Sequence, residues 1–203
     1  GPVSIEQPFV TSEVNLETLA EADLTITAEA VNRTNKAVAA VLRAELEGSF
    51  LSQEIKLDPG EKRTVAFTSQ QFPELKIQDP RLWWPHHLGE PNLYTVKLRF
   101  QTGKLISDED TITFGIREVG DYINEQGHRG FTVNGQKVLV RGGGWVDDLF
   151  MVEEPRVLEA KVKYTKHMNL NTIRLEGFWG SGPELYNLCD RYGILLMAGW
   201  SCQ

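Results

Sequence analysis

The spacing of apolar residues changes once along this chain, near residue 140, and that change sets the fold class. From the start to about residue 130, apolar side chains recur at every second position, as from Leu24 to Ala30 and from Val38 to Leu46. A period of two is typical of strands with one buried face. Shorter runs of the same kind follow around residues 55, 65, 96 and 112, with turn residues between them. About seven short strands favour a β-sandwich.

Beyond Arg141 the apolar positions follow a helical period instead. From Pro155 to Met168 they lie on one face of a 3.6-period helix. The residues predicted for this face are Val157, Leu158, Val162, Tyr164, Thr165 and Met168. A second short helix follows Ser181 and Glu184, which have capping-box spacing. Its predicted buried residues are Leu185, Leu188, Cys189 and Tyr192. Apolar runs at 172–175 and 194–197 predict buried strands.

The order of these elements predicts part of a barrel. From Val138 onward the order is strand, helix, strand, helix, strand, which is the repeating unit of a parallel sheet or a (β/α)8 barrel. Such a barrel needs about 250 residues, and only about 70 follow Lys137, so it cannot close within this chain. We therefore expect an immunoglobulin-like β-sandwich over residues 1–118, then an incomplete, truncated (β/α)8 barrel segment over residues 119–203. Open strand edges in that segment would allow self-association.

Two glycine-containing segments predict turns. Asn134 and Gly135 separate the apolar positions of 131–133 from those of 138–140, and an Asn-Gly pair accepts the positive φ values of a tight hairpin. Gly142, Gly143 and Gly144 lack the spaced glycines and the lysine of a phosphate-binding loop. We interpret these three glycines as a tight turn at the top of a strand.

Composition excludes several functions. The net charge of −7 is unsuited to a nucleic-acid partner, which a concentrated basic face would attract. No apolar run approaches the roughly 20 residues of a membrane span. Cys189 and Cys202 are the only cysteines and predict no disulfide framework. His86 and His87 lack acidic or cysteine neighbours at metal-ligand spacing, so we expect exposed loop residues. We expect neither a metal nor another cofactor.

Several strings, in order along the chain, resemble glycoside hydrolase family 2. They are DPRLWWP at 79–85, the residues Asn92 to Tyr94, FGIREV at 114–119 and FTVNGQKVLVRGGG at 131–144. Together with WVDDLF at 145–150, NTIRLEG at 171–177 and MAGW at 197–200, the last string is most similar to the exo-β-D-glucosaminidase branch of that family. The ending Ser201, Cys202, Gln203 departs from the pattern of two cysteines that relatives carry after the GW pair.

The resemblance implies a retaining glycosidase that acts on oligosaccharides. In such enzymes one carboxyl group protonates the leaving oxygen, and a second, about 5 Å away, attacks the anomeric carbon. The family places these carboxyl groups on the fourth and seventh barrel strands, beyond this chain, so the chain alone should be inactive. A β-mannosidase or β-galactosidase of the same family is the alternative within this class. A non-catalytic sandwich module for binding or spacing is the alternative of another class.

Candidate substrate-binding residues follow the predicted barrel strands. Glu176 ends the RLEG motif, where the resemblance implies a contact with the ammonium group of an amino sugar. Arg174 lies on the same strand and calls for carboxylate partners. Asp148 can accept hydrogen bonds from sugar hydroxyls, whereas Asp147 is expected to be a solvated loop residue. Trp145 is a candidate for stacking on a pyranose ring. Other tryptophans comprise Trp179 and Trp200, also candidates for stacking, and Trp83 and Trp84, expected to be buried in the sandwich.

Overall fold

The chain divides into two compact units. A computed structural model of the protein describes residues 1–146, 154–176 and 183–198. The first unit comprises Gly1–Pro80 and Tyr94–Ile116, and the second comprises Arg81–Leu93 and Arg117–Gln203. Within the described residues, no helix is long and apolar enough to cross a membrane. We describe each unit by itself.

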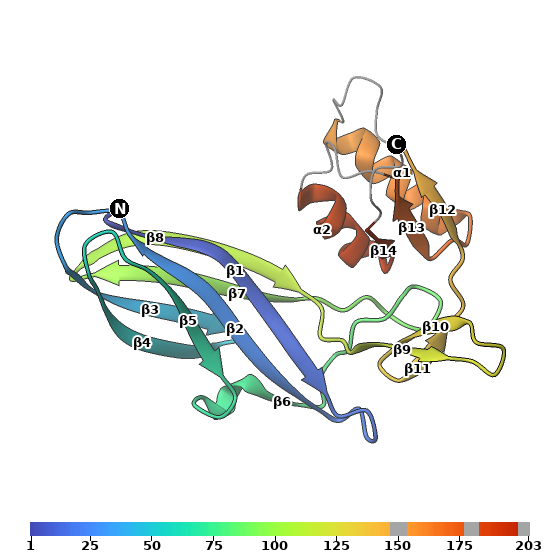
Figure 1. Cartoon of the computed structure of the whole chain (residues 1–203), viewed down its shortest axis with the longest axis horizontal. Coiled ribbons are helices and arrows are strands. Elements are labelled where there is room, and N and C mark those ends of the chain that lie inside the picture. Colours follow the sequence, from blue (N-terminus) through green and yellow to red (C-terminus); the bar gives the residue numbers. More distant parts are fainter. Residues whose placement is uncertain (147–153, 177–182, 199–203) are drawn as a thin grey trace. The chain divides into compact units, whose positions relative to one another are not determined.

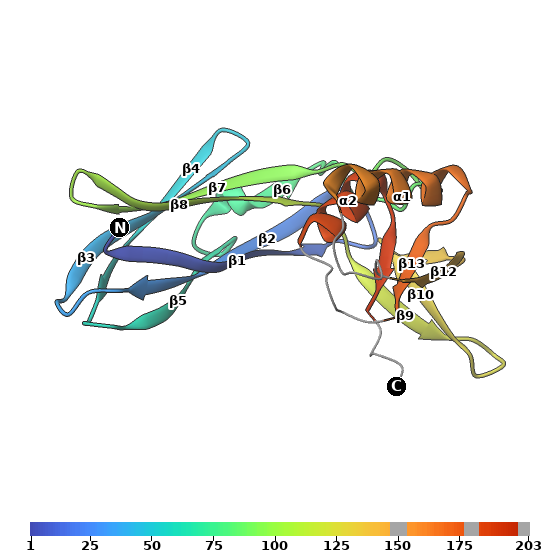
Figure 2. The same ribbon diagram turned by 90° about the horizontal axis from the view of Figure 1, so that it is seen from above.

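The first unit consists of two antiparallel sheets (Figures 1 and 2). One has the order β1-β2-β5, with β6 also paired to β2, and the other has the order β4-β3-β7-β8. The strands are β1 (Val3–Val14), β2 (Glu21–Asn32), β3 (Val38–Leu46), β4 (Ser49–Leu57), β5 (Lys62–Thr68), β6 (Lys76–Gln78), β7 (Tyr94–Thr102) and β8 (Leu105–Phe114), and a 3-10 helix, η1, covers Pro73–Leu75. This arrangement confirms the predicted β-sandwich.

Alternating burial along the strands produces the core of the sandwich. In β2 every second residue from Ala22 to Asn32 is buried, and β7 alternates in the same way from Tyr94 to Phe100. Phe67 and Phe100 are among the largest fully buried side chains. Complete burial of one such apolar side chain contributes roughly 1.5 to 3 kcal/mol. The period-two pattern of the sequence therefore stabilises the fold through side chains directed between the two sheets.

Hydrogen bonds join the start of β1 to β8, a strand of the opposite sheet. The backbone N–H of Val3 donates to Ser107 Oγ at 2.8 Å, and the backbone N–H of Ile5 donates to Asp108 Oδ2 at 2.8 Å. A register shift between Glu6 and Phe9 follows, at Gln7 with a φ of +47°. The shift breaks the alternation of buried residues, and for this reason β1 was not predicted from the sequence.

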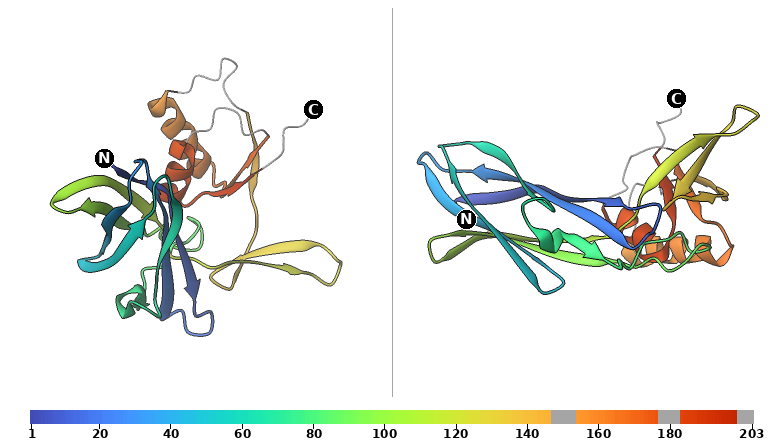
Figure 3. Two further views of the ribbon diagram at one scale, coloured as in Figure 1. Left: turned by 60° about the vertical axis from the view of Figure 1, so that its left-hand side comes forward. Right: turned by 90° about the horizontal axis from the view of Figure 1, so that it is seen from below.

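The second unit contains one antiparallel and one parallel sheet with two helices. The antiparallel sheet has the order β11-β10-β9 and the parallel sheet the order β12-β13-β14. Their elements are β9 (Val119–Ile123), β10 (Arg129–Val133), β11 (Gln136–Val138), β12 (Gly142–Trp145), α1 (Pro155–His167), β13 (Thr172–Leu175), α2 (Pro183–Tyr192) and β14 (Leu195–Met197). Helices α1 and α2 lie on one side of the parallel strands (Figure 3). The strand-helix alternation predicted for this region is present.

The predicted Asn-Gly hairpin joins β10 to β11. Asn134 and Gly135 have φ values of +50° and +75°, and Val133 pairs with Gln136 across the two-residue turn. The Asn134 side chain also accepts a hydrogen bond from the backbone N–H of Glu118 at 2.8 Å and donates to the carbonyl of Trp83 at 3.0 Å. Both the oxygen and the nitrogen of this buried carboxamide are thus hydrogen-bonded, and the hairpin prediction is confirmed.

The glycine run forms a strand, and its prediction as a tight turn is wrong. Gly142 to Trp145 pair in parallel with Thr172 to Leu175 as β12. Val138 belongs to the hairpin, so the parallel sheet begins at Gly142 rather than at Val138. A Cβ atom on Gly142 would lie 2.0 Å from the Thr172 carbonyl oxygen. Close backbone approach, not a turn conformation, therefore explains the glycine at this position.

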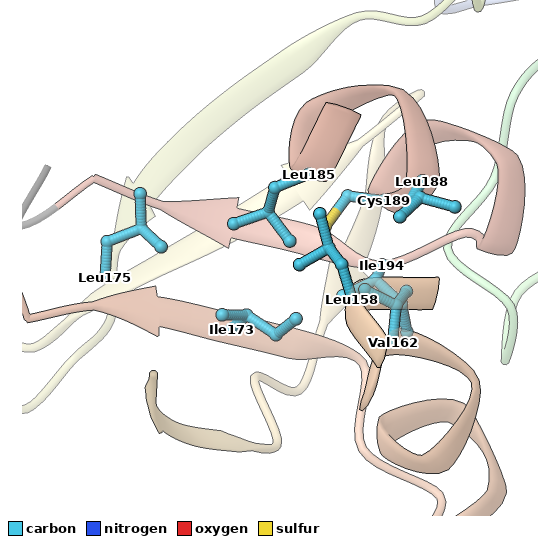
Figure 4. Close-up of a cluster of buried hydrophobic side chains, with 8 residues drawn as sticks. All are labelled: Leu158, Val162, Ile173, Leu175, Leu185, Leu188, Cys189 and Ile194. Carbon is cyan, nitrogen blue, oxygen red and sulfur yellow. The ribbon is translucent and has the colours of Figure 1, made fainter. Parts of the chain in front are cut away.

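The helices bury one face of the parallel sheet (Figure 4). Eight side chains form this helix-sheet cluster: Leu158, Val162, Ile173, Leu175, Leu185, Leu188, Cys189 and Ile194. Both predicted helices are confirmed. The face predicted for α1 is only partly correct, because Val157, Tyr164 and Met168 are exposed, and Tyr192 of α2 is only partly buried.

The segment Arg81–Leu93 belongs to the second unit, although it lies between two strands of the first in sequence. Trp83 is buried and packs with Val133 and Val138, and Trp84 and Leu93 pack against the same cluster. The burial predicted for Trp83 is correct, but Trp84 is only partly buried. Their placement in the sandwich is wrong, because the partners of both rings come from the second unit.

Candidate functional site

Strand β13 has two chemically different faces. Ile173 and Leu175 point into the helix-sheet cluster, with 3% and 2% of their surfaces exposed. Arg174 lies on the other face, as expected for alternate strand positions, and Glu176 follows at the carboxyl end of the strand two positions later. The local sequence thus places a cation and an anion together on the face that the two helices leave uncovered.

Arg174 and Glu176 form an ion pair. Arg174 Nη1 donates to Glu176 Oε1 at 2.9 Å, and the exposed fractions of the two side chains are 51% and 37%. Because both groups contact solvent, the pair itself contributes no more than about 1 kcal/mol to stability. The guanidinium group of Arg174 thus fixes one oxygen of the Glu176 carboxylate. Among the described residues, none donates a hydrogen bond to the other oxygen, which can therefore accept one from a ligand.

The backbone of Glu176 is held by the neighbouring strand. Its N–H donates to the carbonyl of Trp145 at 3.3 Å, continuing the parallel pairing of β12 with β13. Gly144 pairs with Arg174 in that register, and the Glu176 carboxylate lies directly against Gly144. The ends of β12 and β13 therefore position the carboxylate at the carboxyl-terminal end of the parallel sheet.

Trp145 lies on the opposite face from this ion pair. It pairs with Leu175 and packs partly buried against the helix-sheet cluster. Lys161 of α1 places its Nζ 5.3 Å from the centre of the indole ring. The indole N–H is buried, and no described residue accepts a hydrogen bond from it. This geometry gives the ring a packing role between β12 and α1, which weighs against the stacking on sugar expected from the sequence.

Other candidate residues fall outside the described part of the chain. Asp147 and Asp148 precede α1, Trp179 and Ser181 precede α2, and Trp200 follows β14. The described part of the site therefore consists of Arg174, Glu176 and the adjacent Gly144 of β12. The sequence identified Arg174 and Glu176 as separate candidates but did not predict their ion pair.

A second polar group in this unit was not predicted. Arg117 stacks over Trp83 with its guanidinium carbon 4.4 Å from the ring centre, and its Nη2 lies 3.0 Å from Asp190 Oδ1. The indole N–H of Trp83 donates to the Asp190 carbonyl at 2.7 Å. Burial raises the pKa of the Asp190 carboxyl group, and the Arg117 cation opposes that shift. These contacts fasten Arg81–Leu93 to α2 and form a structural network.

His86 differs from the exposed loop residue predicted from the sequence. It is only partly exposed, and its Nε2 lies 2.7 Å from the Leu170 carbonyl, to which it donates in the neutral form. Burial lowers the pKa of His86, and the hydrogen bond to Leu170 opposes that shift. His87 is exposed, as predicted, with Nε2 3.1 Å from the Asn169 carbonyl. Across the described ranges, no cluster of three or more His, Cys, Asp or Glu side chains could hold a metal ion.

Comparison with known proteins supports a carbohydrate-active family. The model of the family described as "Glycosyl hydrolases family 2" matches residues 3–117. Exo-beta-D-glucosaminidase of Streptomyces avermitilis is 36% identical over 202 residues, which cover 100% of this chain and 22% of that protein. Exo-beta-D-glucosaminidase of Hypocrea virens is 39% identical over 209 residues, with the same two coverages.

A solved structure agrees with the sequence matches. The exo-chitosanase CsxA of Amycolatopsis orientalis superposes with a TM-score of 0.91 at 33% identity, over 100% of this chain and 23% of that one. The chain thus spans about a fifth of the length of the proteins that it matches. The match includes both units.

Proposed function

The chain belongs to glycosyl hydrolases family 2, and on that premise we propose that it forms part of a retaining exo-β-D-glucosaminidase. The similarity to exo-β-D-glucosaminidases extends over the full length of the chain. In the proposed enzyme, the first unit is an immunoglobulin-like sandwich. The second unit supplies the opening strands of the catalytic barrel and one side of the sugar-binding pocket.

The parallel sheet supports the barrel assignment. Strands β12, β13 and β14 run in the same direction, and α1 and α2 connect them on one face. In a (β/α)8 barrel, helices cover the outer face and substrate binds where the carboxyl ends of the strands meet. Glu176 follows directly after β13, at the end where this architecture binds substrate. We therefore place the Arg174–Glu176 pair in the substrate pocket of the complete barrel.

The Arg174–Glu176 pair is the observation that carries the proposed specificity. The carboxylate is held by one hydrogen bond of 2.9 Å and remains partly exposed, so one oxygen can accept a hydrogen bond from an ammonium group. A charge-assisted hydrogen bond is worth roughly twice a neutral one. Glu176 would thus favour a positively charged substituent at C2 over a hydroxyl group, as in oligosaccharides of chitosan type.

The other candidates have lesser roles in this proposal. Arg174 orients the carboxylate rather than binding the sugar itself. Asp148 would accept hydrogen bonds from sugar hydroxyls at the end of β12. Trp145 would support β12 by packing against the helix-sheet cluster. None of these residues supplies the catalytic acid/base or the nucleophile, which the family places on later strands.

The chemistry therefore requires the complete barrel. A retaining enzyme needs two carboxyl groups about 5 Å apart, one as acid/base and one as nucleophile. We expect the 203-residue chain alone to release no product from an aryl β-D-glucosaminide, whereas the parent protein should turn it over. Turnover by highly purified chain that disappears in the Glu176→Gln variant would place catalytic groups within this segment and overturn the assignment.

Charge removal at Glu176 tests the specificity. In the parent enzyme, Glu176→Gln keeps the shape of the side chain and one acceptor but removes the negative charge. We expect kcat/KM on β-D-glucosaminides to fall roughly 10- to 100-fold, equivalent to roughly 1.4 to 2.8 kcal/mol. Neutral β-D-glucosides should lose far less. Glu184→Gln, in the first turn of α2, is a control for the loss of one negative charge in this unit.

The specificity of Glu176 is tested by comparing kcat/KM for the glucosaminide and the glucoside. If Glu176→Gln leaves the ratio of kcat/KM values for glucosaminide and glucoside unchanged, Glu176 does not read the charge of the sugar. The parent enzyme would then be a β-glycosidase of other specificity, such as a β-mannosidase or β-galactosidase. Absence of turnover by the parent protein on any β-glycoside would instead favour a binding or spacing module.

A further inference from the structure

The three consecutive glycines of β12 have different surroundings, although all lie in one short strand. A Cβ atom on Gly142 would lie 2.0 Å from the backbone oxygen of Thr172. A Cβ atom on Gly143 would have no heavy atom of the described residues within 4 Å. A Cβ atom on Gly144 would lie 2.4 Å from Oε1 of Glu176 and 3.1 Å from its Cδ. The three positions therefore differ in what a side chain would displace.

The space that a side chain at position 144 would need is occupied by the side chain of Glu176. The three nearest atoms to its added Cβ are Oε1, Cδ and Cγ, all of Glu176. Gly144 is not among the glycines with positive φ, so its backbone conformation suits any residue. Among the described residues, the only strong conflict is with the carboxylate that pairs with Arg174. An alanine at this position would therefore leave β12 possible and move Glu176.

We propose that Gly144 is a specificity-determining positioning residue, which lets the Glu176 carboxylate lie across β12 within reach of Arg174. The proposal rests on the proposed function, because it assigns to Gly144 the placement of the group that would bind the ammonium. Gly144 itself makes no contact with the substrate in this role. Its contribution is the space that a methyl group would fill.

The geometry predicts what an alanine would do. Contacts under 3.0 Å to a Cβ atom do not persist, and the Glu176 side chain is flexible and 37% exposed, so it can rotate away. Its Oε1 would then leave the 2.9 Å contact with Arg174 Nη1. Since a hydrogen bond weakens steeply with such displacement, the carboxylate would lose its fixed orientation toward the sugar. Selectivity for the charged substituent should fall without loss of the fold.

Gly143 provides a matched control on the same strand. In the parent enzyme, Gly144→Ala should lower the ratio of kcat/KM for an aryl β-D-glucosaminide to that for the β-D-glucoside by about tenfold, the worth of one charge-assisted hydrogen bond. Gly143→Ala adds the same methyl group where no described atom lies within 4 Å, and it should leave that ratio within about twofold. If Gly144→Ala leaves this ratio unchanged while Glu176→Gln lowers it, the positioning role of Gly144 is wrong and the proposed function still stands.

The double variant separates this proposal from the proposed function. If Gly144 acts through Glu176, adding Gly144→Ala to Glu176→Gln should lower the ratio no further than Glu176→Gln does by itself. An additive loss would show that Gly144 acts through another group and would contradict the proposal. If Glu176→Gln alone leaves the ratio unchanged, the proposed function fails, whatever Gly144→Ala does.

A stability measurement keeps the proposal testable if Gly144→Ala folds poorly. The nearest conflict lies entirely with the Glu176 side chain, so truncating that side chain should relieve it. Gly144→Ala in a Glu176→Ala background should then lower the Tm no more than Gly143→Ala does in the same background. An equal loss of Tm from Gly144→Ala with and without the Glu176 side chain would place the conflict elsewhere and refute the assignment.

Discussion

The sandwich unit and the second unit bury apolar surface in different ways. Among the largest fully buried side chains of the described residues, all but Trp83 and Leu175 lie in the sandwich unit. The exposed large apolar residues show the opposite distribution. In the second unit they are Leu88, Val119, Ile123, Leu139, Val140, Val146, Val157, Tyr164, Met168, Tyr186 and Met197.

This difference has a physical meaning for the two units. The sandwich directs alternate side chains of two sheets against each other, so its own strands cover its core. The second unit covers one face of a three-stranded parallel sheet with two helices, and parallel sheets are normally covered on both faces. The apolar surface of the second unit supports the proposal that further barrel strands and helices pack against it in the parent protein.

The largest expected effect tests which unit each buried aromatic residue supports. Phe67 of β5 has 0% exposure and Trp83 has 1%. Truncation of either to alanine should cost about 3 to 5 kcal/mol through lost burial and a cavity. Phe67→Ala should destabilise the strands of the sandwich, and Trp83→Ala should destabilise the second unit. Residue-resolved hydrogen exchange during denaturant titration would measure both.

For each of these two variants, the unit that does not contain the substituted residue is the control, and its protection should not change. If Trp83→Ala lowered the protection of β2 and β3 as strongly as Phe67→Ala does, the segment Arg81–Leu93 would belong to the sandwich. That result would restore the location expected from the sequence.

Much of the fold could be predicted because burial follows local periodicity. The alternation in β2 and β3 and the Asn134–Gly135 turn are local signals, and each gave the correct element. The prediction was wrong for the glycines of β12. Gly142 and Gly144 leave space for Thr172 and Glu176, which lie about thirty residues later in the chain, so no local pattern indicates why glycine is needed there. The same limit applies to β1, in which a register shift interrupts the pattern.

The candidate site was predicted residue by residue but not as an arrangement. Position after a strand identified Glu176, and chemistry identified Arg174 as a cation in need of a carboxylate. Their pairing needed only the period of two within β13, a signal that was present in the sequence. The orientation of Trp145 depends on its pairing with Leu175, and that register could not be read before β12 was located.

Hydrogen exchange of the unmodified chain tests whether the second unit is less stable than the sandwich unit. Strands β12 and β14 lie at the two edges of the parallel sheet, and edge N–H groups open to solvent more readily than those of central strands. In dilute monomer, amides after Gly142 should exchange at least about a hundredfold faster than those of β2, β3 and β7, which corresponds to roughly 2.8 kcal/mol. Mass spectrometry or NMR would detect this.

Concentration provides the control for that measurement. If the second unit self-associates through its open edges, protection after Gly142 should rise with protein concentration while protection in the sandwich stays constant. Uniform protection of both units in dilute monomer would contradict the view that the second unit is the less stable part.

Alkaline pH should act on the second unit through Cys189. Burial, and to a lesser degree the neighbouring Asp190, raises the pKa of this thiol to about 12 from a usual value of 9.0. A thiol with a raised pKa in the folded state stabilises the fold below its unfolded pKa, and that contribution is lost as the pH rises through the window up to the folded value. Between about pH 9 and 12, each pH unit should cost up to about 1.4 kcal/mol.

Urea unfolding at pH 8 to 10 would measure this loss, with Cys189→Ala as the comparison. The variant should be less stable at every pH, because it loses buried volume. Its free energy of unfolding should lack the part of the decline with rising pH that ionisation of this thiol causes. Equal slopes in the two proteins would mean that Cys189 ionises as freely when folded as when unfolded. The helix-sheet cluster would then be open to water.

The smallest expected effect lies on the acidic side, at His86. Burial lowers the pKa of this imidazole, and the positive charges of His87, Lys166 and Arg141 act in the same direction. The Leu170 carbonyl, 2.7 Å from Nε2, acts against them. A histidine whose pKa is depressed in the folded state contributes stability above its unfolded pKa of about 6.5, and this contribution is lost as the pH falls through the folded value.

His86→Gln separates this proton from the other effects of acid, since the amide can still donate to Leu170 without titrating. We expect the second unit of the unmodified chain to lose stability from about pH 6.5 downward, and the variant to lack that part of the loss. The effect should be smaller than that at Cys189, because His86 is only partly buried. NMR titration of the imidazole is the direct measurement. A pKa at or above 6.5 would make His86 the solvated loop residue that the sequence suggested, and would weaken the assignment of Arg81–Leu93 to the second unit.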